Sequence, residues 1–226
     1  MSTDDIGHTW KGAAIKYMDG VLWVLLLLHK PREDTAEQRS GSTFREWLRW
    51  GMYGGQSKPR EDGLKTLNRE AAEETLDING NHITITKEMW AESVIVDGPV
   101  KRSQRKDGPD RFQNHFVLTI FPPDTEIGKM VPTNLEIAEA RWFPLTEDED
   151  VLRWLPVPDK LRLSDLELPM PDDDPPWTMT QVFAFEELLD KAAEKWPGAN
   201  GVAALVRKWI DSYEKRNALQ KKQRRY

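Results

Sequence analysis

The longest apolar run in the sequence, VLWVLLLL from Val21 to Leu28, sets the strongest limit on the fold. It is far shorter than the roughly 20 residues that a membrane helix needs. Polar residues do not alternate with the apolar ones, as they do in a strand that faces water on one side. The run therefore predicts a strand that is buried on both faces.

Turn signals and alternating apolar residues predict further strands. Asp19-Gly20 lies between two apolar runs and predicts a hairpin turn. The stretch NHITITKEMWAESVIVDGPV, with Ile83 and Ile85 and later Val94 and Val96, predicts a strand, a turn and a strand. HFVLTIF and EARWFPL predict two more strands, and the polar residues 31–46 predict a surface loop.

Composition excludes several classes of protein. The 226 residues carry a formal net charge of -6, which argues against a dedicated polyanion-binding protein. Cysteine is absent, so disulfides, zinc thiolate sites and thiol nucleophiles are excluded, and any metal must be held by oxygen or histidine. The four histidines show no ligand spacing and are interpreted as structural. The acidic N-terminal stretch does not resemble a signal peptide, and we expect a cytoplasmic protein without a membrane partner.

The C-terminal third differs in composition from the rest. Residues 151–177 are rich in proline and aspartate and predict an irregular connector. Residues 178–226 predict a helical extension of two amphipathic helices with a basic tail. The apolar faces of these helices should pack on the main domain, residues 1–150, or on a second copy of the chain as a homodimer.

Three glutamates share one face of a predicted helix. Glu70, Glu73 and Glu74 are spaced i, i+3 and i+4, so their side chains project toward a single point. Like charges at this spacing destabilise a bare helix. Mg²⁺ or Mn²⁺, which prefers several oxygen ligands, would turn the cluster into a binding site. Taken alone, the pattern also fits a solvated acidic face.

Residues around the glutamates support a site. Arg69 can hold a carboxylate in place through its planar guanidinium, and Asp62 is a candidate cap for the helix N-terminus. Gly54 and Gly55 let the backbone pass close to a ligand, to which Gly55 can lend a carbonyl oxygen.

These residues together resemble a known motif. Gly55, Glu61 and the run Arg69-Glu70-Ala71-Ala72-Glu73-Glu74 have the spacing of the Nudix box, the signature of hydrolases that cleave a nucleoside diphosphate linked to another group. Trp50 and Tyr53 stand where the family often has W-x-x-Pro-Gly-Gly. The resemblance covers roughly residues 10 to 147, and it favours the metal-site interpretation over the solvated face.

The resemblance implies a fold and a reaction. The expected fold class is α/β, an α/β/α sandwich with a mixed sheet, to which the C-terminal helical extension is added. The expected activity is a Mg²⁺- or Mn²⁺-dependent pyrophosphohydrolase that cleaves a phosphoanhydride bond with an activated water. The alternative is a Nudix-fold protein that binds a nucleotide, an RNA end or a protein partner with little turnover.

Residue roles follow from the resemblance by position. Glu70, Glu73 and Glu74 would be metal ligands, with Glu70 the leading candidate to activate water and Arg69 to orient it. Glu61 would support the helix, together with Gly54, or reach an outer metal. Glu136 matches a further metal ligand of the MutT-like branch, and Glu139 is the second candidate.

One position departs from the motif, and the substrate is left open. The glycine that usually ends the box helix is Leu76 here, so we expect the helix to continue and the chain to turn at Asn79-Gly80. The family acts on nucleoside triphosphates, nucleotide sugars, ADP-ribose and related compounds. Candidate substrate contacts are Trp50 and the cations of the loop 101–111, namely Lys101, Arg105 and Arg111. The basic tail permits an RNA partner but supports it only weakly.

Overall fold

The structure is a computed structural model that describes residues 6–29, 49–102, 109, 111–131, 136–145, 179–195, 201–204 and 206–207. The predictions for the loop 31–46, the connector 151–177, Arg105 and the basic tail fall outside these residues. None of the helices in the described ranges is long and apolar enough to cross a membrane.

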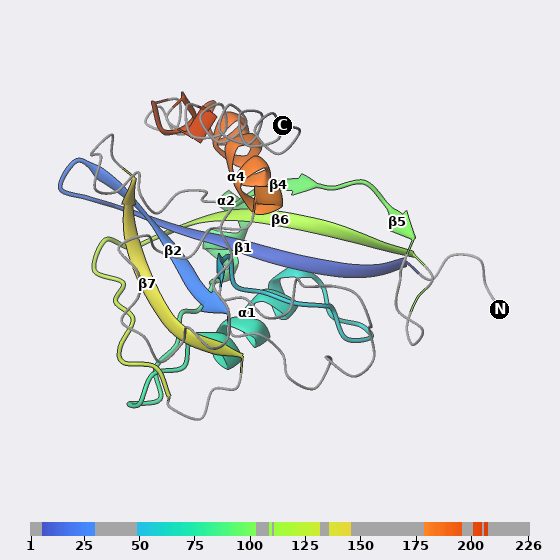
Figure 1. The fold of residues 1–226 in the computed structure, drawn as a ribbon, viewed down its shortest axis with the longest axis horizontal. Helices are drawn as coiled ribbons and strands as arrows, with labels where there is room; N and C mark the ends of the chain where they lie inside the picture. The colour runs from blue at the N-terminus through green and yellow to red at the C-terminus, as the bar shows by residue number, and fades with distance from the viewer. Residues whose placement is uncertain are drawn as a thin grey trace, which may run out of the picture.

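A seven-stranded mixed sheet forms the centre of the fold (Figure 1). The strand order is β3-β2-β1-β6-β4, while β5 pairs with β6 and β7 pairs with β2. β1 and β6 run parallel, and the other pairs run antiparallel. The elements are β1 (Ile6–Met18), β2 (Val21–His29), β3 (Arg49–Gly51), α1 (Gly63–Glu74), α2 (Lys87–Glu92), β4 (Val94–Asp97), β5 (Lys101–Arg102), β6 (Arg111–Phe121), β7 (Ile137–Leu145) and α4 (Met179–Ala192).

The hairpin of β1 and β2 confirms the first two predictions. Asp19 and Gly20 have positive φ angles of 52° and 80°, which a two-residue turn of the primed type requires. β2 is buried on both faces: Val24 and Leu26 belong to one hydrophobic cluster, and Leu25 and Leu27 belong to the other. The unbroken apolar run is therefore explained by a sheet that is covered on both sides.

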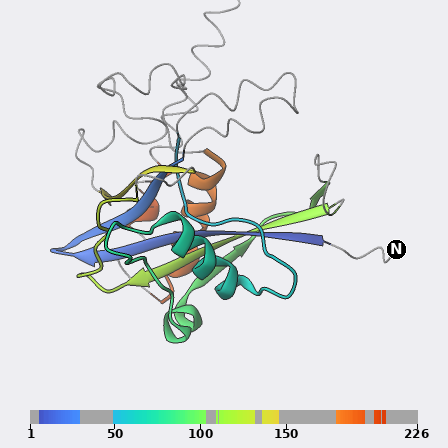
Figure 2. The same cartoon turned by 90° about the horizontal axis from the view of Figure 1, so that it is seen from below.

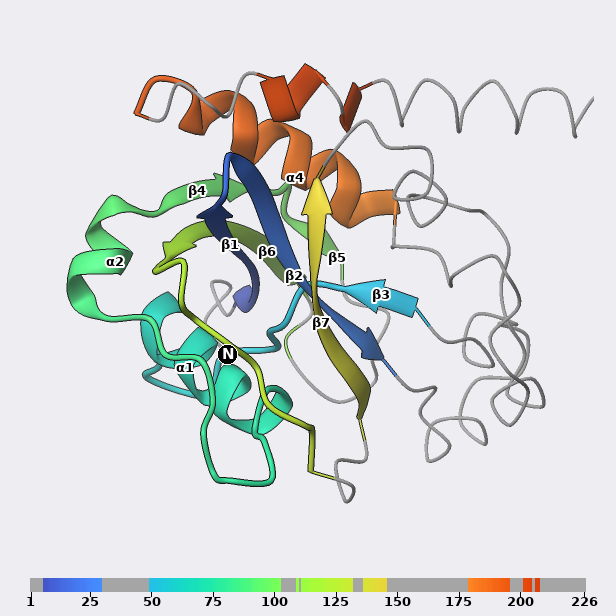
Figure 3. The ribbon, with the colours of Figure 1, turned by 90° about the vertical axis from the view of Figure 1, so that its left-hand side faces the viewer.

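Two helices supply those covers, and Figure 3 shows α1 and α4 on opposite sides of the sheet. On the α1 side, Leu67 and Ala71 pack in one cluster with residues of β1, β2, β6 and β7. On the α4 side, Phe185 and Leu188 pack in the other cluster with the opposite face of the same strands. The layers form the α/β/α sandwich.

The C-terminal segment contributes to this core. Phe185, Leu188 and Leu189 of α4 have no exposed surface. Ala203 and Val206, from the described part of the second predicted helix, are buried in the same cluster. The apolar face of α4 therefore packs on the main domain.

The strand predicted around Ile83 and Ile85 is wrong. Both side chains are buried, but residues 81–86 form no strand, and α2 follows directly. The Asn68 side chain takes the place of a strand partner: its amide nitrogen donates to Ile85 O at 2.9 Å, and its oxygen accepts from Ile85 N at 2.7 Å. The alternation therefore reflects an extended segment that packs against α1, outside the sheet.

The expected continuation of the box helix is also wrong, because α1 ends at Glu74. The N–H and the hydroxyl of Thr75 both donate to Ala71 O, so the last turn closes without a left-handed residue. The turn at Asn79-Gly80 is present, with Gly80 at a φ of 83°. Leu76 is thus accommodated by a different helix end.

Candidate active site

A gap between two strands positions the site. β1 and β2 pair only from Ile15 and Val24 to Met18 and Val21. Beyond this point the strands separate, and the segment that follows β3 fills the space. Three backbone hydrogen bonds of 2.9 Å join this segment to β1, from Gly12 N to Tyr53 O, from Trp10 N to Gly55 O and from Ser57 N to His8 O.

α1 brings its glutamates against this segment. Asp62 caps the N-terminus of α1, since its carboxylate accepts a 2.8 Å hydrogen bond from the backbone N–H of Lys65. Leu67 and Ala71 face the sheet, and Glu70 and Glu74 are buried beside them, with 8% and 4% of their surface exposed. Glu73 lies at the rim with an exposed side chain. The i, i+3, i+4 spacing therefore places two of the three carboxylates inside the protein.

Gly54 holds the carboxylate of Glu74. Its backbone N–H donates a 2.7 Å hydrogen bond to Glu74 Oε2, and its carbonyl accepts a hydrogen bond from the Lys11 ammonium. The φ of Gly54 is 124°, and a Cβ atom there would lie 2.2 Å from Trp10 O. Glycine is required at this position, because any side chain would clash with β1.

Gly55 leaves room for the carboxylate of Glu70, because it has no side chain. A Cβ atom on Gly55 would lie 2.3 Å from Glu70 Oε1 and 2.5 Å from its carboxyl carbon. The Glu70 carboxylate therefore rests directly against the glycine backbone, in the space that a side chain would fill.

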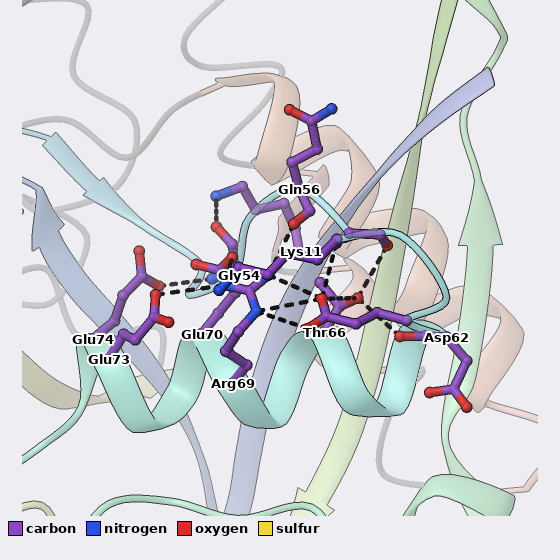
Figure 4. A network of polar contacts seen from close by, with 12 residues as sticks. Lys11, Gly54, Gln56, Asp62, Thr66, Arg69, Glu70, Glu73 and Glu74 are labelled. Carbon is purple, nitrogen blue, oxygen red and sulfur yellow. Dashed lines mark hydrogen bonds and ion pairs between the residues drawn. The ribbon is translucent and has the colours of Figure 1, made fainter. Parts of the chain in front are cut away.

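Arg69 connects the loop to the helix, as Figure 4 shows. Its guanidinium donates to Glu61 Oε1 at 3.1 Å, to Glu70 Oε1 at 2.6 Å and to the carbonyl of Gln56 at 2.8 Å. A weaker contact of 3.4 Å reaches Glu73. One planar group thus fixes Glu61, Glu70 and the loop backbone relative to each other.

Burial dominates the electrostatics of the two inner carboxyls. It raises the pKa of Glu74 to about 7, because Lys11 and the Gly54 N–H only partly offset the loss of solvent, and Glu70 and Glu136 add repulsion. Burial likewise raises the pKa of Glu70, although the hydrogen bond and charge of Arg69 oppose the shift. Both groups would gain from a further positive charge.

The ion pair of Arg69 with Glu61 favours the charged form of both groups. The Arg69 hydrogen bond is the largest of the effects that lower the pKa of Glu61. Burial alone would lower the pKa of Arg69, but the hydrogen bonds and charges of Glu61 and Glu70 outweigh it and raise the pKa. The pair therefore stays ionised and holds its geometry.

The donor set suits a hard divalent cation. Glu70 and Glu74 are buried oxygen donors against the backbone of Gly54 and Gly55, and Glu136 is close enough to Glu74 to influence its pKa. Within the described residues, no three histidine or acidic side chains already converge as a ready-made metal cluster. Instead, Arg69 donates a hydrogen bond to Glu70, and the charge of Lys11 acts on Glu74. Residues that are able to hold a cation are thus present, and two cationic side chains compensate their charge.

The remaining predicted site residues are dispersed. Trp50 has 1% exposed surface and packs edge-on against Phe143, with ring centroids 4.7 Å apart. It is therefore a core residue, and the predicted substrate contact at this position is corrected. Lys101 and Arg111 are exposed on β5 and β6. Glu139 pairs with Arg141 at 2.6 Å, and Glu136 directly precedes β7.

Sequence reasoning missed Lys11. A single lysine in the first half of a strand carries no motif, and its neighbours in sequence do not show where its ammonium group reaches. Only the backbone pairing of β1 with the segment 53–57 brings it to Gly54.

The fold is thus an α/β/α sandwich with two buried carboxylates against a glycine loop. The family model described as NUDIX domain matches residues 24–165, more than half of the chain, so the chain belongs to the Nudix family. No curated protein matches the chain.

Solved structures with the same domain resemble the chain at low identity. A MutT/nudix family protein from Enterococcus faecalis is 18% identical over 66% of this chain and 48% of that chain, with a TM-score of 0.39. This chain thus spans about half of that protein. The Ap4A hydrolase of C. elegans is 17% identical over 62% of this chain and 81% of that chain, with a TM-score of 0.31. The NUDIX domain of Shewanella oneidensis NrtR, complexed with ADP ribose, is 19% identical over 64% of this chain and 75% of that chain, with a TM-score of 0.34.

Proposed function

We propose that the chain is a hydrolase that depends on Mg²⁺ or Mn²⁺ and cleaves a phosphoanhydride bond in a nucleoside diphosphate linked to another group. The observation that carries this proposal is the seating of Glu70 and Glu74 against Gly55 and Gly54. Two buried carboxylates in contact with the same loop are costly without a cation.

The cation would be held by Glu70, Glu73, Glu74 and the carbonyl of Gly55, with Glu136 as an outer ligand. When bound, it neutralises charge on the diphosphate and lowers the pKa of a coordinated water. Glu61 fixes Arg69, and Arg69 orients Glu70 through their 2.6 Å hydrogen bond. The elements of the site are therefore ordered before substrate arrives.

Glu70 is our candidate to accept the proton from the attacking water. Its pKa is raised by burial, which makes it a stronger base than an exposed carboxylate. Glu73 is exposed, whereas Glu70 is buried and is oriented by its hydrogen bond from Arg69. The products would be a nucleoside monophosphate and a phosphorylated remainder, or a diphosphate lost from a triphosphate.

The substrate should carry several phosphates. Lys101 and Arg111 are exposed cations that are available to phosphate groups, and Arg105 is carried forward from the sequence as a third. A cytoplasmic location, a homodimer and an RNA partner likewise stay predictions from the sequence.

The deciding experiment measures phosphate and nucleotide release from a panel of nucleotide substrates with Mg²⁺ or Mn²⁺. Wild type is compared with Glu74→Gln and with Glu92→Gln, a control on an exposed glutamate that only approaches Lys195 at 3.9 Å. We expect turnover in wild type and in Glu92→Gln, and its loss in Glu74→Gln.

The alternative, a binding protein with little turnover, has one observation in its favour. Lys11 and Arg69 already offset part of the charge of the inner carboxylates, which lowers the cost of burying them without a cation. Absence of turnover in folded wild-type protein, together with a nucleotide that raises its melting temperature, would establish this alternative.

A further inference from the structure

Lys11 is a cationic residue of the site that lies outside the Nudix box. It belongs to β1, and Figure 2 shows α1 lying across this strand. The Lys11 ammonium donates a hydrogen bond to the carbonyl of Gly54, while the N–H of the same glycine donates to Glu74 Oε2 at 2.7 Å. Gly54 therefore links a lysine of the sheet to a glutamate of the helix.

The two cationic side chains of the site are held to different degrees. The Arg69 guanidinium donates to two carboxylates and to the carbonyl of Gln56 (Figure 4). Among the residues that the structure describes, the Lys11 ammonium donates to the Gly54 carbonyl alone. A lysine stem is flexible, so one hydrogen bond leaves the ammonium able to turn away. Arg69 is thus a fixed part of the site, whereas Lys11 is able to move.

The charge of Lys11 acts on the inner carboxylates without a direct ion pair. It is the largest of the effects that lower the pKa of Glu74, and it also acts to lower the pKa of Glu70. Since its hydrogen bond goes to a backbone carbonyl, Lys11 takes no carboxylate oxygen away from a cation. Its effect on a bound cation is therefore one of charge.

This charge has opposite effects on the two states of the site. Without a divalent cation, the ammonium offsets part of the repulsion between the buried carboxylates of Glu70 and Glu74. With a divalent cation among the same carboxylates, the ammonium is a like charge nearby and weakens binding. Removal of the Lys11 charge should therefore favour the cation-bound state and disfavour the cation-free one.

We propose that Lys11 is a resident counter-ion of the site: it holds Gly54 beside Glu74 in the absence of a divalent cation, and it competes with that cation. This role rests on the proposed function, since it takes Glu70 and Glu74 as cation ligands. It makes Lys11 a positioning residue that sets the cation affinity, although the Nudix box does not include it.

Mn²⁺ tests this role, because the electron paramagnetic resonance signal of the free ion reports how much is bound. Mn²⁺ is titrated into wild type and three variants at pH 7.5. We expect Lys11→Met, which keeps the stem without the charge, to bind Mn²⁺ about tenfold or more tightly than wild type. Lys11→Arg keeps the charge and should stay close to wild type. Lys65→Met, on an exposed lysine of α1, is the matched control and should also stay there.

Unfolding in EDTA supplies a second readout that involves no metal. At pH 8, Lys11→Met should lower the free energy of unfolding, because Glu74 loses a compensating charge. The loss should be smaller when Glu74→Gln is already present, since a neutral amide needs no counter-ion. A lysine that only packs against its neighbours would cost the same in both backgrounds. Lys11→Gln, which is also neutral, replaces Lys11→Met if that variant does not fold.

Mn²⁺ affinity in the neutral variant that equals or falls below that of wild type overturns the proposal, because the loss of a merely structural lysine does not tighten binding. Absence of Mn²⁺ binding in wild type and in the neutral variant also overturns it, together with the metal dependence of the proposed hydrolysis. The titration measures no turnover. A protein that binds Mn²⁺ in the expected order but hydrolyses no substrate therefore contradicts the proposed function and not the role of Lys11.

Discussion

The backbone N–H of Gly54 donates a 2.7 Å hydrogen bond to the carboxylate of Glu74 at the end of α1. This contact joins two parts of the site that are 20 residues apart in sequence. It also keeps a buried carboxylate, which has 4% exposed surface, directed at the gap between β1 and β2. The helix end and the glycine loop therefore act as one unit.

Glu74 should make the stability of the cation-free protein depend on pH. Its pKa is about 7 in the folded protein against an ordinary value of 4.5, so folding is favoured while Glu74 is protonated. This contribution is complete below about pH 4.5 and is lost as the pH rises through about 7. The shift corresponds to about 3 kcal/mol.

Urea unfolding in EDTA between pH 4.5 and pH 8 checks this expectation. The stability of wild type relative to Glu74→Gln should fall as the pH rises over this range. Parallel curves for the two proteins would show that the Glu74 carboxyl is not desolvated as the structure indicates.

Arg69→Lys should impair catalysis more than folding. Lysine keeps the charge but cannot hold Glu61, Glu70 and the Gln56 carbonyl with one planar group. We expect kcat to fall about 10- to 100-fold, the usual effect of losing a residue that orients a ligand.

Steady-state kinetics of Arg69→Lys are compared with those of Arg207→Lys. Arg207 is a matched control, since it also bridges two acids, Glu186 and Asp190, but on an exposed surface. Adding Glu61→Gln to Arg69→Lys should cost little more, because both changes disrupt the same interaction. Fully additive losses would contradict the shared role.

Gly12→Ala should destabilise the protein through Tyr53. A Cβ atom on Gly12 would lie 2.3 Å from the Tyr53 ring, and Tyr53 is fully buried. Overpacking of this kind costs about 1–3 kcal/mol. Denaturant unfolding should show this loss, while Gly201→Ala, where no atom lies within 4 Å of the added methyl group, stays near wild type.

A smaller residue at 53 supplies the converse test for this pair. Gly12→Ala should cost less in a Tyr53→Leu background than in wild type, because the clashing ring is absent. Equal costs in the two backgrounds would place the strain elsewhere.

Leu188→Ala should destabilise the whole domain. Leu188 of α4 is fully buried in the cluster that includes Val24 and Leu118, so the variant leaves a cavity in the main core. We expect a loss of about 2–5 kcal/mol in a single unfolding transition. Glu187→Ala, on the exposed side of the same helix, is the control. A separate early transition would instead show that α4 unfolds independently of the sheet.

Local patterns predicted the parts of the fold that depend on near neighbours. The apolar run of β2 indicated burial on both faces, and Asp19-Gly20 indicated the hairpin, since both signals follow from the backbone period and turn geometry. The same patterns failed at Ile83 and Ile85. There the extended segment found its hydrogen-bond partner in the side chain of Asn68, which no local period encodes.

The sequence by itself determined the spacing of Glu70, Glu73 and Glu74 on one helix face, because 3.6 residues per turn fix it wherever the helix forms. Only the tertiary structure decided which of these carboxylates are buried, and that Lys11 reaches Gly54. It also brought His8 and His115, 107 residues apart, within 2.9 Å. Such contacts depend on how distant strands are ordered in the sheet, and burial and charge are properties of that arrangement rather than of any short segment.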